Sequence, residues 1–247
     1  MKLSACLLLL LVGCTEQDGP KYDINTPGGP GGTGSPSGSG TAARISGRVC
    51  VLADPQILDA CSIKGAGGLT VAMGSATATT SADGSFTIEP TPNEGNGGSG
   101  GTATAPFSVT GTGIVPSQRA MAANGSTIIP VMSNDLYNQM VLATGITTEP
   151  DTGSVLASIT TPTGFPKPGI TATADPALAA GPYFDATGTS PWTLNATGAR
   201  GVAYFPNIST LGPSSLTFTD PTTGGETTVD GIQVVNGGIT YIDATLP

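Results

Sequence analysis

The sequence predicts an all-β protein with two small antiparallel β-sandwiches and a short linking helix, preceded by a disordered tether. Two observations predict this class. Glycine and proline are abundant (37 and 21 of 247 residues) while aromatic residues make up 5 %, a composition that suits short strands and many turns better than long helices. Short runs also alternate apolar and polar residues, and Asp-Gly or Asn-Gly pairs stand between them, as expected for half-buried strands joined by tight turns.

Residues 1–13 are predicted to be a secretory signal peptide. Lys2 supplies a positive charge, residues 7–12 form an apolar run, and Gly13 is a small residue before the expected cleavage point. The run is too short to span a bilayer as a stable helix. An ordinary secretory signal, in which Cys14 is incidental, is the alternative to the resemblance described next.

The segment from Leu11 to Cys14 (Leu-Val-Gly-Cys) resembles the lipobox of bacterial lipoproteins. The resemblance implies cleavage before Cys14 and attachment of acyl chains such as palmitate to this residue. Several chains would anchor the protein stably, whereas one chain binds a membrane only marginally. Thr15 stands where aspartate retains many Gram-negative lipoproteins at the inner membrane. The resemblance therefore implies a lipid-anchored protein of the outer membrane, on its periplasmic or extracellular face.

Residues 14–43 are predicted to be a lipidated linker rich in Gly, Pro and Ser. Such a segment cannot form a core and is expected to be a flexible coil. A coil of about 29 residues has a root-mean-square span of roughly 30 Å. The linker is therefore expected to act as a tether.

The remaining chain is predicted to contain two copies of one pattern, residues 44–131 and 152–247. Five segments recur in the same order: 45–51 with 152–159, 68–72 with 169–173, 80–88 with 197–205, 107–110 with 216–219, and 124–129 with 236–242. Each copy is predicted to form a β-sandwich. The alternating apolar residues predicted to lie between the sheets of the first copy are Val49, Val51, Leu69, Val71, Phe86, Ile88, Phe107 and Val109.

Residues 132–151 interrupt the β pattern and are predicted to contain a short helix and a linker. Ser133 is a suitable N-cap, Leu136 and Met140 have helical spacing, and Gly145 is a suitable terminator. The helix is expected to link the two copies and to cover part of one sandwich.

The repeated segments resemble the carboxypeptidase regulatory-like domain. Its opening Gly-x-Val strand is matched by Gly47-Arg-Val49 and Gly153-Ser-Val155, and its Thr-rich turn and strand by residues 80–88 and 197–205. Copy two has Arg200 where copy one has Asp83, a departure from the family's pattern. The resemblance covers about 44–131 and 152–247 and implies Ig-like or transthyretin-like sandwiches. It brings no catalytic motif with it.

Cys50 and Cys61 are the other cysteines of the mature chain and are predicted to form a disulfide. The bond would close a loop of about a dozen residues and stabilise the fold by roughly 2–3 kcal/mol on the chain-entropy model. A redox or metal role would need closer spacing or further ligands.

Charge and composition argue against several classes of function. The net charge is −9 and no basic patch is present, which disfavours nucleic acid as a partner. Histidine is absent, so the usual neutral-pH general base and the commonest zinc ligand are missing. We expect no enzyme, and we assign no catalytic residue, cofactor or metal ligand.

Two sets of carboxylates are candidates for metal binding or catalysis. Calcium takes several oxygen ligands from loops, but solvated turn residues are the better interpretation of the first set, which is Asp54, Asp59, Asp83 and Glu89. A carboxylate pair for glycoside hydrolysis would come from the second set, which is Asp175, Asp185, Asp220 and Asp230. No feature of the sequence selects one pair.

The leading hypothesis is a membrane-anchored lipoprotein whose non-catalytic sandwiches have a structural or adhesive role. The partner would be an unknown protein or an envelope polysaccharide, bound through loops or exposed strand edges. The alternative is a carbohydrate-binding module, with Tyr183, Phe184 and Trp192 as a possible ligand platform. For Trp192, a place in the core is the better interpretation.

Overall fold

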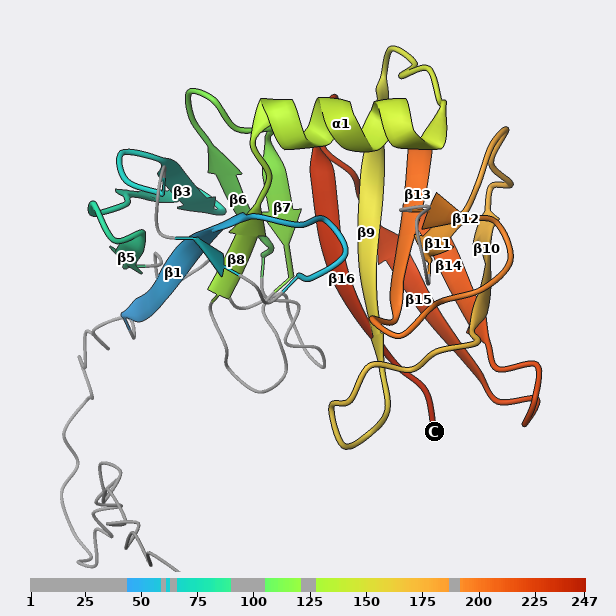
Figure 1. Cartoon of the computed structure of the whole chain (residues 1–247). Helices are drawn as coiled ribbons and strands as arrows, with labels where there is room; N and C mark the ends of the chain where they lie inside the picture. The colour runs from blue at the N-terminus through green and yellow to red at the C-terminus, as the bar shows by residue number, and fades with distance from the viewer. Residues whose placement is uncertain (1–43, 59–60, 63–65, 90–104, 121–127, 187–191) are drawn as a thin grey trace, which may run out of the picture. The chain divides into compact units, whose positions relative to one another are not determined.

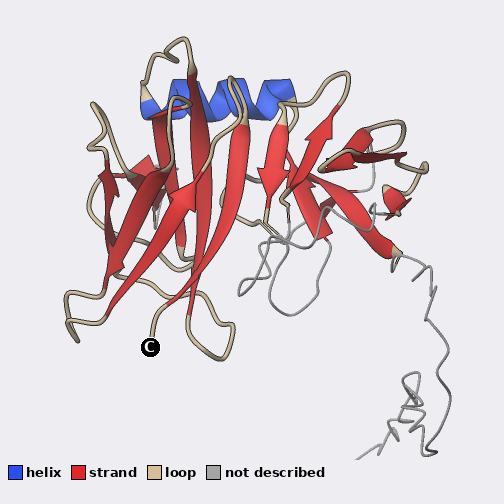
Figure 2. Ribbon diagram, turned by 180° about the vertical axis from the view of Figure 1, so that it is seen from behind, coloured by secondary structure: helices blue, strands red, loops and turns tan. Residues whose placement is uncertain are grey.

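The computed structural model describes residues 44–58, 61–62, 66–89, 105–120, 128–186 and 192–247. These belong to one compact unit that begins at residue 40. The predicted signal peptide, the tether, Cys14 and Asp59 lie outside the described residues. The described chain is mostly β with one helix, α1 (Asn134–Thr144), which confirms the predicted fold class (Figures 1 and 2).

The described strands fall into two groups on either side of α1. The first group is β1 (Ile45–Leu52), β2 (Cys61–Ser62), β3 (Thr70–Met73), β4 (Ala76–Thr79), β5 (Ser85–Ile88), β6 (Phe107–Thr110), β7 (Ser117–Arg119) and β8 (Ile128–Val131). The second group is β9 (Thr152–Thr160), β10 (Thr171–Asp175), β11 (Tyr183–Asp185), β12 (Trp192–Thr193), β13 (Val202–Ser209), β14 (Ser214–Thr219), β15 (Glu226–Ile232) and β16 (Ile239–Thr245).

Each group forms a two-layered sandwich. In the first, β1 pairs with β2, β5 and β8, and the facing layer has the order β4-β3-β6-β7. In the second, β10-β14-β15 faces β12-β11-β13-β9-β16. Parallel pairing of β7 with β16 then joins one layer of each sandwich into a nine-stranded sheet. The boundary between the two predicted domains is thus crossed by continuous strand pairing.

The topology repeats between the two groups as the sequence pattern predicted. β1 lies between an antiparallel β5 and a parallel β8, and β9 lies between an antiparallel β13 and a parallel β16. The β3–β6 pair corresponds to β10–β14, with Phe107 and Leu216 in equivalent registers. The strands of the two groups are therefore arranged in the same way.

A buried threonine occupies the same position in each copy. The Thr80 hydroxyl accepts a hydrogen bond from the Leu69 N–H at 2.9 Å, and Thr197 accepts one from Ile170 at 2.9 Å. Each threonine N–H donates back to the same partner's carbonyl, at 2.8 and 2.9 Å. The two copies therefore share this hydrogen bonding at the start of the matched segments 80–88 and 197–205.

The predicted alignment of the opening strands was wrong by four residues. Phe86 and Ala203 are equivalent residues of the matched segments 80–88 and 197–205. Gly47 pairs with Phe86 in the first copy, but it is Ala157 that pairs with Ala203 in the second. Gly153, which was matched to Gly47, instead approaches the turn before β16, where a Cβ atom would lie 2.4 Å from the Val235 carbonyl oxygen. Both strands begin with similar Gly/Ser/Val residues, so composition alone could not set the register.

Two separate cores fill the sandwiches. All the residues predicted to face inward in the first copy belong to its core or pack against it, with Val51 half-buried and the rest buried. The second core includes Phe184, Phe205 and Phe218, and the last two stack edge to face at 5.9 Å. Period-two alternation thus correctly predicted the inward face of the first sandwich.

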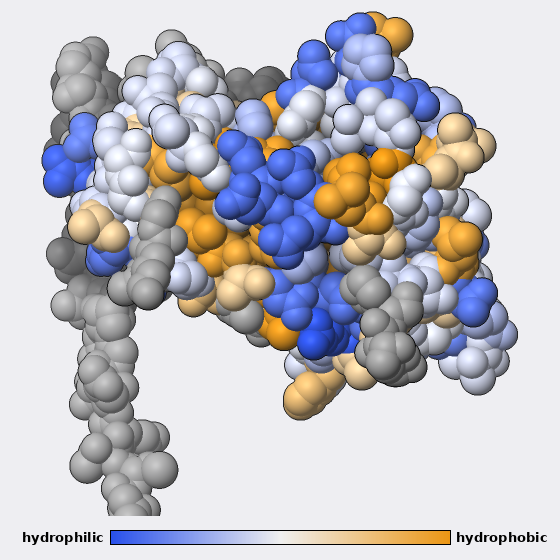
Figure 3. All heavy atoms as spheres, turned by 45° about the horizontal axis from the view of Figure 1, so that its top comes forward, coloured by the Kyte–Doolittle hydropathy of each residue, from blue (hydrophilic) through white to orange (hydrophobic). Residues whose placement is uncertain are grey.

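The predicted helix is formed where expected. The Ser133 hydroxyl accepts from the Leu136 N–H at 3.2 Å, and Gly145 ends the helix with a φ of 69°. Met140 is buried, and α1 lies across one end of β16, β9 and β13 (Figure 1). The exposed residues of α1 include Asn134, Asp135, Asn138 and Gln139, and hydrophilic surface covers the middle of this face (Figure 3).

Candidate functional site

A third core lies where the two sandwiches meet. It combines residues of the first group with residues of α1 and the second group, namely Cys50, Leu52, Val115, Met132, Met140, Leu156, Trp192, Val202, Tyr204, Ile239 and Tyr241. These side chains cover part of the outer face of the β13-β9-β16 layer. The sandwiches therefore share buried apolar surface in addition to the β7–β16 pairing.

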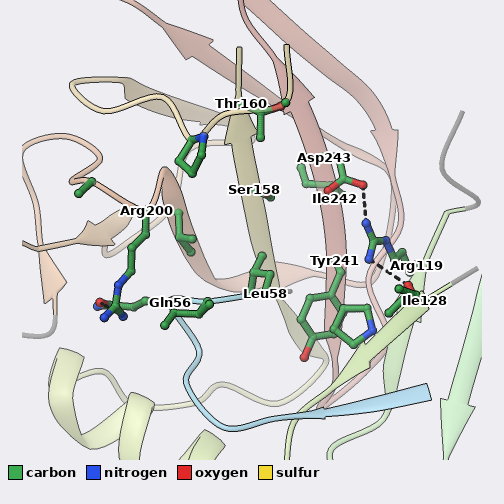
Figure 4. Close-up of a pocket in the computed structure, with 16 residues that line it drawn as sticks. Gln56, Leu58, Arg119, Ile128, Ser158, Thr160, Arg200, Tyr241, Ile242 and Asp243 are labelled. Carbon is green, nitrogen blue, oxygen red and sulfur yellow. Dashed lines mark hydrogen bonds and ion pairs between the residues drawn. The ribbon is translucent and has the colours of Figure 1, made fainter. Parts of the chain in front are cut away.

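The rest of this junction is a groove of about 370 Å³ (Figure 4). Its lining includes Ser158, Thr160 and Tyr241 from the joined sheet, Leu58 from the loop after β1, and Pro130 from β8. Hydroxyl groups and apolar side chains are mixed in it. Such a lining suits binding better than acid–base chemistry.

Two ion pairs connect the sandwiches at the groove, and each sandwich supplies the arginine of one pair and the aspartate of the other. Arg119 of the first group lies 2.7 Å from Asp243 of the second and also donates to the Ile128 carbonyl at 3.0 Å (Figure 4). Arg200 of the second group lies 2.7 Å from Asp54 of the first. Partly exposed pairs of this kind stabilise by about 0–1 kcal/mol each. Their main effect is to fix the orientation of the junction.

The predicted disulfide between Cys50 and Cys61 is formed. It closes the loop that carries Asp54, Gln56 and Leu58 to the second sandwich. Arg200 also approaches the Gln56 side-chain oxygen, at 3.4 Å. The disulfide thus restrains a segment that contributes to the junction.

Two buried polar atoms of the junction, Gln56 Nε2 and Tyr241 Oη, have no hydrogen-bond partner among the described residues. Burial raises the pKa of Tyr241 well above its usual range, so this phenol stays neutral at physiological pH. It is therefore unsuited to act as a base.

The carboxylates weighed for calcium have separate partners. Asp54 pairs with Arg200, and Glu89 pairs with Arg44 at 2.6 Å. Asp83 accepts from the Ser85 N–H and hydroxyl, and the backbone hydrogen bond is the main cause of its lowered pKa. Within the described residues, no three His, Cys, Asp or Glu side chains gather in a way that could hold a metal ion.

The candidate carboxylates for glycoside hydrolysis lie in different surroundings. Asp185 is buried and accepts three backbone N–H groups, those of Gly198, Arg200 and Val202, at 2.8–3.0 Å. Asp220 pairs with Lys167 at 3.1 Å. The other two are exposed, Asp175 at the end of β10 and Asp230 on β15. The first two carboxylates stabilise loops.

We predict that Asp220 contributes to stability at neutral pH and that this contribution is lost in acid. The Thr222 N–H, followed by the Lys167 ammonium, lowers the pKa of Asp220 from 3.8 to about 2. The unfolded chain therefore binds a proton before the folded chain does, and stability falls as pH drops from about 4 to about 2. Asp220→Asn should make this fall shallower in urea unfolding across that range. Asp175→Asn is the control, and an equal change in both variants would contradict the prediction.

The possible carbohydrate platform is not an exposed surface. Phe184 is 2 % exposed in the second core, and Trp192 is 7 % exposed in the junction core. Tyr183 is half-buried, and its ring and that of Trp192 lie 6.3 and 5.7 Å from the ring of Tyr204. The core interpretation of Trp192 is confirmed. Tyr183 and Phe184 point to opposite faces because neighbouring strand residues alternate.

Arg119, Arg200 and Asp243 line the junction groove, and none of them was predicted as a site residue from the sequence. A weak signal was present, because Lys and Arg together number 8 against 17 Asp and Glu. An arginine within a strand of such an acidic chain has many possible carboxylate partners. The sequence alone could not say which one lies near it.

No protein-family model and no curated protein matches the chain. Among solved structures it is similar to the Bacillus anthracis TIE protein (11 % identity, TM-score 0.25, 83 % of this chain and 34 % of that one). It is also similar to a Streptococcal ancillary pilin (11 %, 0.25, 83 % and 69 %) and to the shaft pilin spaA of Lactobacillus rhamnosus GG (12 %, 0.23, 84 % and 98 %). The chain thus spans about a third of the first of these proteins. Similarity at this level does not extend to activity or partners.

In the part of the chain that the structure describes, no helix is both long and apolar enough to cross a membrane.

Proposed function

We propose that this protein is a lipid-anchored, non-catalytic envelope protein that presents two rigidly joined β-sandwiches in a structural or adhesive role. The observation that carries the proposal is the junction. Strand pairing, a shared core and two ion pairs join the sandwiches into one body. Rigidly joined modules hold a fixed separation, whereas flexibly linked modules do not.

The charged groups support a non-catalytic role. The best-anchored carboxylates, Asp185 and Asp220, bind backbone N–H groups or a lysine. The Tyr241 hydroxyl lies in the junction core with a raised pKa. Asp185 and Asp220 thus have structural roles, and the Tyr241 phenol stays neutral, so none of these groups is positioned as a free acid or base.

The anchor rests on the sequence. The lipobox-like segment ending at Cys14 and the glycine-rich tether would hold the sandwiches near the outer membrane. We further propose that the two copies are divergent carboxypeptidase regulatory-like domains. Their repeated topology and the equivalent threonines Thr80 and Thr197 support a common origin for the copies.

The carbohydrate-binding alternative receives less support, because Phe184 and Trp192 are buried. Phe165, with 70 % exposure, is the large exposed aromatic residue of the described surface. A glycan array probed with residues 40–247 tests this alternative. Glycan binding that is lost in Phe165→Ala and is competed by a defined envelope glycan would favour the alternative over the structural role.

The anchor is tested by labelling cells that express the full-length chain with radioactive palmitate. We expect label on the parent protein and recovery in the outer-membrane fraction, with both lost in Cys14→Ser. Cys61→Ser is the matched control, since it removes a cysteine that is predicted to carry no lipid. An unlabelled parent protein, or label that persists in Cys14→Ser, would overturn the anchor.

A further inference from the structure

The two sandwiches differ at one sheet edge. In the first, β4 pairs antiparallel with β3, so that Val71 lies opposite Ala78 and Met73 opposite Ala76. In the second, β10 takes the position of β3 and pairs with β14. Among the described residues, no strand pairs with the other edge of β10.

The backbone groups on this open edge can be identified from the strand parity. The N–H and C=O of Ile170 point away from β14, because both bond to Thr197. Alternate residues of an antiparallel strand bond to the same side. The groups of Ala172 and Ala174 therefore point to the open edge, and the next residue of this parity, Pro176, has no N–H.

The first sandwich supports this assignment. Leu69 bonds to Thr80 as Ile170 bonds to Thr197. The backbone groups of the next two residues of the same parity, Val71 and Met73, point to β4. These two residues are 0 % and 5 % exposed. Their counterparts Ala172 and Ala174 are only half-buried, although both pack against the second core. The open edge thus coincides with incomplete burial.

The path of the chain explains why the edge is open. In the first sandwich, the residues just before Thr80 form β4 and fold back on β3. In the second, the three residues just before Thr197 form no strand, and β12, which precedes them, pairs with β11 in the facing layer. The chain has switched sheets, and the ladder that begins at Thr197 does not continue along β10.

We propose that the open edge of β10 pairs antiparallel with β10 of a second copy of this chain. The strand that covers the equivalent edge in the first sandwich alternates Ala and Thr (76–79), and β10 itself alternates Thr and Ala from 171 to 174. Two copies of β10 related by a two-fold axis would place Ala172 of each opposite Ala174 of the other. The result is a closed, isologous contact that joins two three-stranded layers into one six-stranded sheet.

The charges fit this register. Asp175 of each copy would lie opposite Thr171 of the other, so no carboxylates face each other across the axis. The edge of β8 is unsuited to the same pairing, because Pro130 lacks an N–H and Arg119 bonds to the Ile128 carbonyl. Few hydrogen bonds are available at the β10 edge, so the association should be weak and promoted by confinement to a membrane.

The proposal is tested by symmetric cross-linking of the full-length chain. Thr173 of the two copies would face each other as a non-hydrogen-bonded pair about 4.5 Å apart between Cα atoms, within the range that a disulfide spans. Thr173→Cys should therefore give a covalent dimer on mild oxidation. Thr228→Cys, an exposed threonine of β15, is the matched control and should stay monomeric.

A second variant separates pairing from folding. Ala172→Pro removes an N–H that points to the open edge and no hydrogen bond to β14, so the protein should keep its unfolding midpoint. Added to Thr173→Cys, it should reduce cross-linking at least tenfold. Equal cross-linking at positions 173 and 228, or cross-linking that survives Ala172→Pro, would overturn the proposal. The proposal would also be overturned if the protein were monomeric and a chain of a different protein covered the β10 amides.

This proposal goes beyond the proposed function and does not depend on the anchor. The Cys14→Ser chain, concentrated in solution, should give the same cross-link through Thr173→Cys. A failed palmitate experiment would therefore leave the pairing of β10 standing, and failed cross-linking would leave the anchor standing.

Discussion

Asp185→Ala is expected to lower the free energy of unfolding by about 3–5 kcal/mol. The carboxylate is 1 % exposed, and its oxygens accept the N–H groups of Gly198, Arg200 and Val202 at 3.0, 2.8 and 2.8 Å. Hydrogen bonds to a charged group contribute about 1.5–3 kcal/mol each, and buried donors left without an acceptor add a further penalty. Because the three bonds act together on one loop, their contributions will not simply add.

The measurement is urea unfolding of residues 40–247, the compact unit of the fold. Asp185→Asn gives a graded comparison, since its oxygen can keep the Oδ1 bonds to Gly198 and Val202 while its amide opposes the Arg200 N–H. Its expected loss is about 1–3 kcal/mol. The exposed Asp230→Ala should change stability by less than about 0.5 kcal/mol. A loss for Asp185→Ala no larger than that of Asp230→Ala would contradict the role assigned to this carboxylate.

Local patterns in the sequence predicted the interior of the first sandwich well. Alternation identified the inward residues of the first copy, and the caps at Ser133 and Gly145 identified the helix. The same rule of alternation also shows why a platform containing both Tyr183 and Phe184 was unsuitable, because adjacent residues of a strand face opposite sides. These features depend on neighbours in the sequence, so the sequence expresses them directly.

The junction could not be predicted in the same way. β7 is three residues long and polar, and its partner β16 lies more than a hundred residues further along the chain. Nothing in Ser117-Gln-Arg119 distinguishes a joining strand from a loop. The role of Asp185 was hidden for a related reason, since its hydrogen-bond donors are backbone N–H groups, which every residue except proline has.

The second prediction with a large effect concerns the glycine that precedes β5 in the first copy and β13 in the second. Gly84 and Gly201 have φ values of 84° and 64°, and a Cβ atom on either would lie 2.3 or 2.4 Å from the carbonyl oxygen of Val49 or Ile159. The same neighbours are hydrogen-bonded to the glycines, since Val49 and Ile159 donate to the carbonyls of Gly84 and Gly201 at 2.8 and 2.7 Å. Alanine would therefore force the strands apart at a point that both copies share.

We expect Gly201→Ala to lower the free energy of unfolding by about 3 kcal/mol or more, and Gly84→Ala by a similar amount. About 1–2 kcal/mol comes from placing a Cβ atom in the left-handed region, and the rest from the backbone shift that relieves the clash. Gly237→Ala isolates the first contribution, because Gly237 has a φ of 63° with nothing within 4 Å of the added atom. Urea unfolding of the three variants measures the difference. If Gly237→Ala destabilised the protein as much as Gly201→Ala, close approach of the strands would not be the reason for glycine at the repeated position.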